Sequence, residues 1–343
     1  MLPAARAAVA DGLARWANPS SPHAAGRAAR AALEDARTRI AAALDWDGEV
    51  ILTSGSSEAI AMALGRAAGI DAVLTSTVEH DAVRRAAGDD AYNLPVGDDG
   101  LVAQDALAGR LGALGANRPL VAIQSMNSET GVIQPLDLLG ETIAAARSIL
   151  FVDASQSAGK IALPDAPLIA VSAHKLGGPP GVGALLVRDL ALIAAVGGQE
   201  QGYRPGTENL PGALGFAAAL EAPRGWIARA ADLRAHCDAA IEAGGGEVVA
   251  RRAPRFAGIA SYRMPGVAAS AQLIQFDLAG IAVSAGSACS SGTLKPSHVL
   301  AAMGWSEAAA REVIRVSFGP ETSRADVYRF LDAWRRIAGG GRA

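Results

Sequence analysis

Lys175 is the residue of this chain with the clearest capacity for covalent chemistry. The chain has 31 basic residues, and only three of them are lysines: Lys160, Lys175 and Lys295. Lys175 closely follows an apolar run at residues 168–172, which predicts a buried strand. Desolvation at such a position disfavours the charged ammonium and frees the amine for Schiff-base chemistry. The alternative interpretation is an ordinary surface charge at the end of a strand.

Two polar residues follow a second apolar run, at residues 149–152. Asp153 could pair with a protonated ring nitrogen and thereby make an aromatic cofactor an electron sink. It could also cap a helix, as aspartates after strands commonly do. Gln156 could reach the phenolic oxygen of the same ring or belong to the same cap.

A phosphate group could bind in the small-residue turn at residues 53–58. The free N–H groups and the positive end of the dipole at the start of a helix suit an anion there. A simple helix cap is the alternative. His80 could stack on an aromatic ring and move protons, or serve as a core or cap histidine.

Cys289 lies among Ser, Gly and Ala at residues 284–292, which favours an accessible loop with a reactive thiol. Cys237 lies in an apparent helix, and we expect it to pack on a helix face. His236 beside it could imitate a Cys/His pair, but neighbouring helix residues do not face each other.

The elements that must position these residues alternate between short strands and Ala-rich helices. Strands are predicted at residues 50–52, 72–75, 120–124, 149–152, 168–172 and 182–187. Such alternation indicates an α/β fold with a mainly parallel sheet, covered by helices on both faces. Ligands then bind outside the carboxyl ends of the strands, where most of the polar residues above are found.

A domain boundary is predicted near residues 222–225, where Pro and Gly cluster. We expect a large domain at residues 1–223 and a smaller α/β domain at residues 224–343. In the smaller domain the pattern predicts helices at residues 226–243 and 324–337, and strands at residues 259–261 and 281–283.

Composition excludes several classes of protein. The 343 residues carry a net charge of −3, which gives no basic field for nucleic acid. No apolar run approaches the ~20 residues of a membrane span, and the first residues carry Arg and Asp where a signal peptide is apolar. Two cysteines cannot build a disulfide framework. We therefore expect a cytoplasmic globular protein.

Motifs with chemical potential follow one another at residues 53–58, 79–80, 127–131, 152–160, 172–175, 203–209, 284–290 and 314–317. In this order they resemble the cysteine desulfurases, which are pyridoxal 5'-phosphate enzymes of the class V aminotransferase group. The resemblance covers residues 18–330, and the loop around Cys289 is similar to that of the NifS/IscS-like branch. It implies the PLP-dependent transferase fold of the aspartate aminotransferase type.

For the cofactor, the resemblance implies that Lys175 forms the covalent link and that Asp153 pairs with the ring nitrogen. His80 would stack on the ring, and Gln156 would bind its phenolic oxygen. No metal is implied. A phosphate contact from the partner subunit implies a homodimer with composite sites. The implied phosphate ligands are Ser56, Ser57, Ser172, His174 and Thr207 of the partner subunit.

For the substrate, the resemblance implies that Arg315 clamps the carboxylate of L-cysteine as a bidentate pair. Lys175 would remove the α-proton, and the Cys289 thiolate would attack the substrate sulfur. L-alanine then leaves, and the persulfide passes to an acceptor such as an iron–sulfur scaffold protein. The acceptor uses the sulfur for iron–sulfur clusters or thio-cofactors.

Two features depart from the family pattern. The family has two asparagines where this chain has Asn127 and Ser128, and the second asparagine contacts cofactor and substrate. The family also opens with a short strand and an Ala-Thr-Thr segment, so we expect either a start further upstream or a pocket wall that is partly missing. The alternative functions are a selenocysteine lyase, another class V enzyme, or a non-catalytic paralogue that acts as a binding partner.

Overall fold

The computed structural model describes residues 1–115, 118–288 and 294–340. Within them the chain divides into two compact units. The first contains Met1–Leu94, Gln104–Met126 and Pro135–Ala222, and the second contains Pro95–Ala103, Asn127–Gln134 and the chain from Pro223 onward. The second unit thus includes two segments that precede the boundary expected at residue 223.

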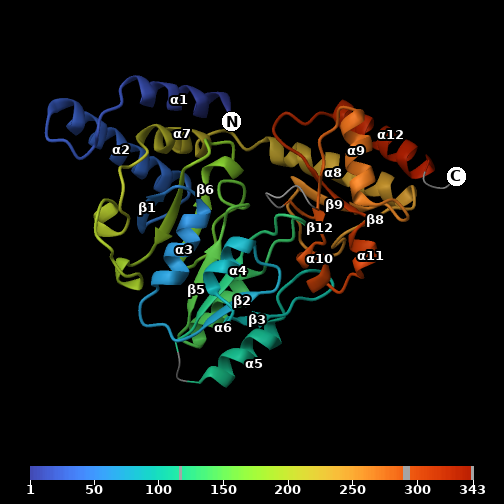
Figure 1. Ribbon diagram of the computed structural model, residues 1–343, viewed down its shortest axis with the longest axis horizontal. Coiled ribbons are helices and arrows are strands. Elements are labelled where there is room, and N and C mark those ends of the chain that lie inside the picture. The colour runs from blue at the N-terminus through green and yellow to red at the C-terminus, as the bar shows by residue number, and fades with distance from the viewer. Residues whose placement is uncertain (116–117, 289–293, 341–343) are drawn as a thin grey trace. The chain divides into compact units, whose positions relative to one another are not determined.

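A seven-stranded sheet in the order β1-β7-β6-β5-β4-β2-β3 forms the centre of the first unit (Figure 1). Neighbours are parallel from β6 to β3, whereas β7 runs antiparallel to both β1 and β6. The predicted α/β fold with a mainly parallel sheet is therefore confirmed. Its strands are β1 (Glu49–Thr53), β2 (Val73–Ser76), β3 (Tyr92–Leu94), β4 (Leu120–Gln124), β5 (Ile149–Asp153), β6 (Leu168–Ser172) and β7 (Gly183–Val187).

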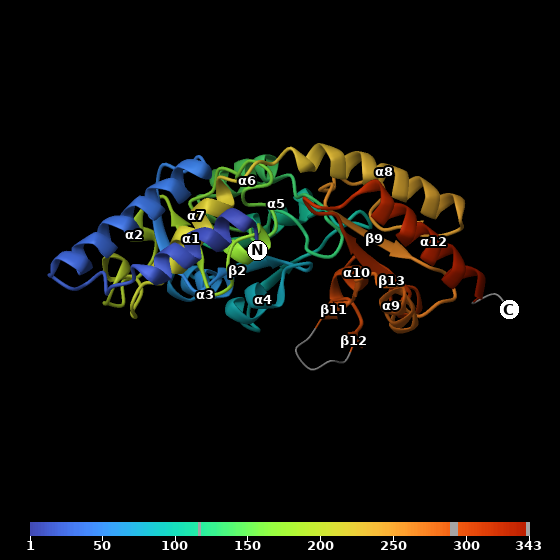
Figure 2. The same cartoon turned by 90° about the horizontal axis from the view of Figure 1, so that it is seen from above.

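Helices pack around this sheet because alternate strand residues point to opposite faces. Side chains such as Ile51, Phe151 and Leu185 form one apolar cluster with Ile60 of α3 and Val83 of α4. Helix α7 is buried along its whole length and packs against α1 and α2 (Figures 1 and 2). The helices are α1 (Pro3–Ala14), α2 (Ala24–Ala43), α3 (Ser56–Arg66), α4 (Asp81–Ala87), α5 (Gln104–Leu114), α6 (Leu136–Ala145) and α7 (Leu210–Leu220).

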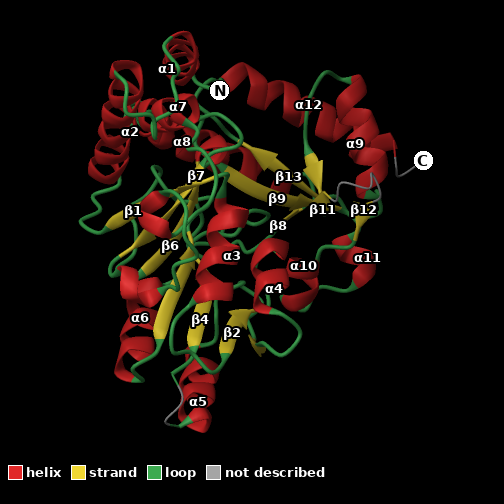
Figure 3. Ribbon diagram, turned by 60° about the vertical axis from the view of Figure 1, so that its left-hand side comes forward, coloured by secondary structure: helices red, strands yellow, loops and turns green. Residues whose placement is uncertain are grey.

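The second unit contains an antiparallel sheet in the order β10-β13-β9-β8 (Figure 3). Helices α8 and α12 contact each other in this unit (Figure 2). Its elements are α8 (Trp226–Ala243), β8 (Glu247–Val248), β9 (Ile259–Arg263), α9 (Ala269–Leu278), β10 (Ser284–Ala285), β11 (Ser287–Ala288), β12 (Leu294–Lys295), α10 (His298–Ala302), α11 (Glu307–Ala310), β13 (Val313–Ser317) and α12 (Arg324–Gly340).

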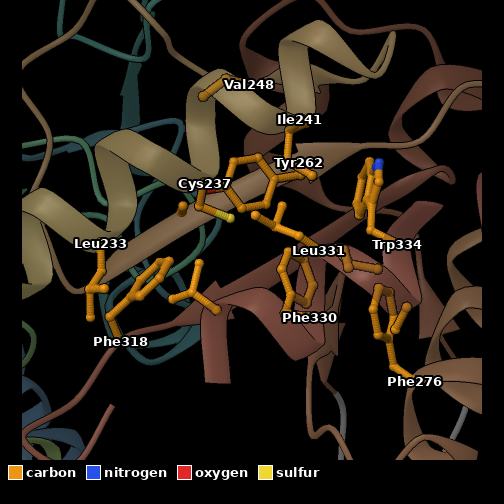
Figure 4. Packing of buried hydrophobic residues seen from close by; sticks show 14 of the residues in the cluster. Leu233, Cys237, Ile241, Val248, Tyr262, Phe276, Phe318, Phe330, Leu331 and Trp334 are labelled. Atoms are coloured by element: carbon orange, nitrogen blue, oxygen red, sulfur yellow. The ribbon is translucent and has the colours of Figure 1, made fainter. Parts of the chain in front are cut away.

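Several aromatic side chains gather in the core of this unit although aromatic residues are only 4% of the sequence. The rings of Phe276 and Phe330 stack with their centroids 5.1 Å apart, and Tyr262 and Trp334 pack beside Phe330 (Figure 4). Cys237 lies fully buried in the same cluster, as its position on a helix predicts. Burial raises the pKa of its thiol to about 12, so this cysteine is protonated at neutral pH.

One predicted strand is wrong. Residues 281–283 form no strand, and the strand begins at Ser284, where the register with Arg315 of β13 starts. Ile281 and Val283 instead pack against the apolar core of the second unit. Their apolar character predicts burial correctly, but burial alone does not specify backbone pairing. None of the helices in the described ranges is long and apolar enough to cross a membrane.

The turn before α3 depends on a close approach of two glycine backbones. A Cβ on Gly183 would lie 2.5 Å from the carbonyl oxygen of Val171 and 2.7 Å from Cα of Gly55. The Val171 oxygen cannot move away without disturbing the strand pairing between β6 and β7, and Gly55 is held between the end of β1 and the start of α3. Gly183 therefore lets the turn at Gly55 lie against the sheet.

We predict that Gly183→Ala lowers the free energy of unfolding by about 1–3 kcal/mol, as overpacking typically does. Chemical denaturation of the variant measures this change. Gly109→Ala is the matched control, because its Cβ would meet nothing within 4 Å on exposed helix α5. Alanine is favoured over glycine in a helix by about 0.5–1 kcal/mol, so the control should be stabilised. Equal effects of the two substitutions would contradict the packing argument.

Candidate functional site

The carboxyl ends of the strands in the first unit collect most of the predicted site residues. Asp153 ends β5 and lies in register with Ala170 of β6, and Ser172 ends β6. Lys175 follows in a short 3₁₀ turn at Ala173–Lys175, where its side chain is exposed. The site therefore lies at the edge that strand direction predicts.

The small-residue turn reaches the same edge through the antiparallel strand β7. Gly183 of β7 is in register with Thr53 on one side and with Ser172 on the other. Helix α3 then begins with Ser56, which is half-buried, and Ser57, which is exposed. No side chain of the described residues caps this helix at Gly55, so its first N–H groups remain available.

Ser172 and His174 form a hydrogen-bonded pair beside this helix start. The Oγ atom of Ser172 lies 2.9 Å from Nδ1 of His174. Burial and the positive charge of Lys175 lower the pKa of His174. At neutral pH the ring is therefore uncharged and can exchange a hydrogen bond with the serine hydroxyl.

Asp153 is buried, and its local contacts fix its carboxylate. The Oδ1 atom accepts a 2.9 Å hydrogen bond from the backbone N–H of Ser155 and a second bond from the Ser155 hydroxyl. Residues 155–160 form turns rather than a helix, so the helix-cap interpretation of the sequence is wrong. The pairing with Ser155 instead fixes the turn that follows β5. It leaves the second carboxylate oxygen for another partner.

His80 caps helix α4, as one interpretation of the sequence predicts. Its Nδ1 accepts a 3.1 Å hydrogen bond from the backbone N–H of Ala82, while the ring is exposed. In the neutral ring the proton then lies on Nε2. Gln156 is half-buried after β5, and its backbone carbonyl oxygen accepts a 2.8 Å hydrogen bond from Nζ of Lys160. Thr207 is exposed in the first unit.

Glu79 is a buried carboxyl to which the sequence assigned no role. Its Oε1 accepts hydrogen bonds from Oγ of Ser76 at 2.6 Å and from the backbone N–H of Gln124 at 2.9 Å. Burial, with a contribution from the negative charge of Asp153, raises the pKa of Glu79 to about 8 against the two hydrogen bonds. The side chain is therefore mostly neutral at pH 7. The sequence around Glu79 and His80 carries no signal that would predict a buried, neutral glutamate.

The expected substrate residues lie in the second unit. Arg315 donates from Nη1 to the backbone oxygen of Ser128 at 3.0 Å and from Nη2 to Oγ of Ser284 at 3.1 Å. Burial lowers the pKa of its guanidinium, partly offset by the charge of Glu129. The group has no carboxylate within ion-pair distance in the described chain. It is thus arranged to receive an anion.

Asn127 has a structural role that the sequence did not predict. Its Oδ1 accepts hydrogen bonds of 2.9 Å from the backbone N–H groups of both Glu129 and Thr130. The side chain thereby shapes the turn that presents the oxygen of Ser128 to Arg315. Cys289 lies outside the described residues.

A family model for aminotransferase class V matches residues 8–330 of the chain. The chain belongs to this family. It is 35% identical over 344 residues to a cysteine desulfurase of Gluconacetobacter diazotrophicus, covering 93% of this chain and 85% of that protein. A NifS-like protein from Rickettsia africae has a TM-score of 0.91 at 26% identity, covering 99% of this chain and 96% of that one. A structure titled SspA in complex with cysteine has a TM-score of 0.79 at 26% identity, covering 94% and 97%.

The predicted resemblance to the class V group and its cysteine desulfurases is therefore confirmed. Enzymes of this class V family use pyridoxal 5'-phosphate, which is the cofactor of this protein. The residues of the first unit fit it, because the uncapped start of α3 suits its phosphate and Asp153 suits its ring nitrogen. Lys175 supplies an amine at the end of the strand next to that of Asp153.

The raised pKa of Glu79 predicts a pH-dependent stability. Between the unfolded value of 4.5 and the folded value of about 8, the folded protein holds more protons than the unfolded chain. The contribution of the Glu79 carboxyl to the free energy of unfolding is complete below pH 4.5 and is lost as pH rises through about 8. Glu79→Gln keeps a neutral side chain and removes this loss. We predict that the Tm of the variant gains on that of wild type as pH rises from about 5 to about 9.

The comparison uses cofactor-free protein, since the cofactor brings charges of its own. Glu141→Gln on the exposed surface of α6 is the matched control, and its Tm should follow wild type across the range. If the Tm of Glu79→Gln changed with pH in parallel with that of wild type, the assignment of Glu79 as a buried neutral carboxyl would be contradicted.

Proposed function

We propose that this protein is a cysteine desulfurase that converts L-cysteine to L-alanine and carries the sulfur as a persulfide on Cys289. The observation that carries this proposal is the placement of Lys175 and Asp153 at the ends of neighbouring strands, in a chain that is 35% identical to a named cysteine desulfurase. A lysine amine and a carboxylate in this arrangement serve amino-acid chemistry on a pyridine ring.

Lys175 acts first as the residue that holds the cofactor and then as the base for the substrate. Its exposed amine can accept the proton from the substrate Cα once the substrate has displaced it. Asp153 keeps a proton on the ring nitrogen, and its two bonds from Ser155 hold the carboxylate in place for this. When bound, the cofactor withdraws electrons from the substrate Cα.

Phosphate binding falls to the start of α3 and to the Ser172 and His174 pair. Ser56 and Ser57 present both hydroxyls and backbone N–H groups at the helix N-terminus. A helix start attracts anions through its dipole and unpaired donors. His80, held at its Nδ1 by Ala82, offers a ring face to the cofactor and an Nε2 proton to the reaction. Gln156 binds the phenolic oxygen.

Arg315 binds the substrate carboxylate, together with the turn of Asn127 and Ser128. Its free donors and its lack of a carboxylate partner in the described chain support this role. A planar guanidinium binds a carboxylate through two parallel hydrogen bonds. The SspA structure, by its title, holds cysteine itself, which supports cysteine as the substrate.

Cys289 completes the transfer. Its thiolate sulfur forms a bond to the substrate sulfur, and the bond from that sulfur to Cβ breaks. The electron pair stays on the carbon side, where one proton completes the methyl group. Lys175 returns a proton to Cα, which gives L-alanine. The other cysteine of the chain, Cys237, cannot serve because it is buried and its thiol is protonated.

The protein works as a homodimer in which Thr207 of the partner subunit adds a phosphate contact. Exposure of Thr207 in the single chain is compatible with that role. An acceptor protein, such as an iron–sulfur scaffold, receives the sulfur. We place this reaction in the cytoplasm, where thiols remain reduced.

We predict that Cys289→Ser retains bound cofactor but forms no persulfide with L-cysteine. Mass spectrometry of the peptide that contains residue 289 detects the mass of one added sulfur atom in wild type. Cys237→Ala is the matched control and should keep the modification on Cys289. Persulfide on Cys237, or alanine release that is unchanged in Cys289→Ser, would overturn the assignment of Cys289.

A further inference from the structure

Arg315 is a partly buried cation whose hydrogen-bond partners in the described chain are both neutral. Nη1 donates to a backbone oxygen and Nη2 donates to a hydroxyl, while the buried Nε has no hydrogen-bond partner among the residues that the structure describes. Buried arginines are normally paired with an anion, because the charge is costly to desolvate. The carboxylate assigned to Arg315 above is therefore the missing partner, and the neighbours of Arg315 decide how it is held.

Ser284 is the neighbour closest to the guanidinium on strand β10. It is in direct register with Arg315 of β13, and its Oγ accepts the bond from Nη2. Because a serine hydroxyl has one donor in addition to its lone pairs, the hydroxyl proton remains. In the described chain that proton has no acceptor among the recorded hydrogen bonds of Ser284. An anion on Arg315 would provide one.

Other serines that contact Arg315 or its neighbour Glu129 do not offer this combination. Ser261 flanks Arg315 on the opposite strand, β9, but donates its hydroxyl to the backbone oxygen of Glu129 at 2.7 Å. Ser297 donates its hydroxyl to Oε2 of Glu129 at 2.5 Å. Ser128 contacts Arg315 through its backbone oxygen. Ser284 alone among these four combines a side-chain bond to Arg315 with a free hydroxyl proton.

We propose that Ser284 is a specificity-determining residue that holds Arg315 and donates its hydroxyl proton to the substrate carboxylate. This rests on the proposed role of Arg315. It gives the site a side-chain donor at the point where Ser128, shorter than the asparagine of the family pattern, has no amide to offer. The neutral donor distinguishes a carboxylate from an uncharged group, because hydrogen bonds to charged acceptors are the stronger ones.

The test measures binding of L-alanine and of L-alaninamide to the cofactor-loaded protein, followed by the absorbance of the bound cofactor. The dissociation constant of L-alaninamide divided by that of L-alanine reports the preference for a carboxylate. We expect Ser284→Ala to reduce this ratio roughly tenfold to a hundredfold, and Ser284→Thr to restore most of it. Ser317→Ala, at the exposed end of the same strand β13, is the matched control and should leave the ratio unchanged.

Cofactor content and Tm of each variant show that it is folded. A ratio in Ser284→Ala equal to that of wild type would overturn the proposal, as would a failure of threonine to restore the loss. The binding probes need no sulfur transfer. If wild type forms no alanine from cysteine but Ser284→Ala still loses the preference, the proposed function fails and this inference stands. If desulfuration occurs and the ratio does not change, only this inference fails.

Discussion

The backbone pairing of strand β7 with both β1 and β6 is the constraint on which the cofactor site depends. It places the end of β1 beside the end of β6, and so brings the start of α3 to the serine and lysine that follow β6. The pairing is possible because Gly183 leaves room for the backbone of Gly55. A helix start, a carboxylate and a lysine amine from distant parts of the sequence thus reach one edge of the sheet.

Electrostatics in each unit follow from which charges are buried and which partners they have. Burial, with a contribution from the negative charge of Asp153, raises the pKa of Glu79 to about 8, so Glu79 is mostly neutral at pH 7. Arg315 is partly buried and its hydrogen-bond partners in the described chain are neutral, so it retains the capacity to bind an anion. In both cases a polar group that is costly to bury is retained next to the proposed chemistry. Glu79 lies beside Asp153, and Arg315 is the proposed ligand of the substrate carboxylate.

The sequence predicts the buried strands of the large sheet well because each is a short apolar run, and 120–124 and 168–172 match β4 and β6 in both bounds. It misses β3, whose residues Tyr92–Leu94 are mostly exposed. Strand direction then predicts where Asp153 and Lys175 lie. It does not predict the protonation of Glu79, which depends on burial among side chains from other strands. The sequence also does not predict the bond between Ser284 and Arg315. That bond follows from the register of β10 with β13, whereas the apolar pattern predicts a strand at residues 281–283.

The most direct test of this account is the formation of L-alanine from L-cysteine by the purified, cofactor-loaded protein in the presence of a reductant. Reductant removes the persulfide sulfur and allows further turnovers without a protein acceptor. The account predicts alanine in at least equal amount to the enzyme, with matching sulfide. Absence of alanine from protein that visibly holds its cofactor would contradict it.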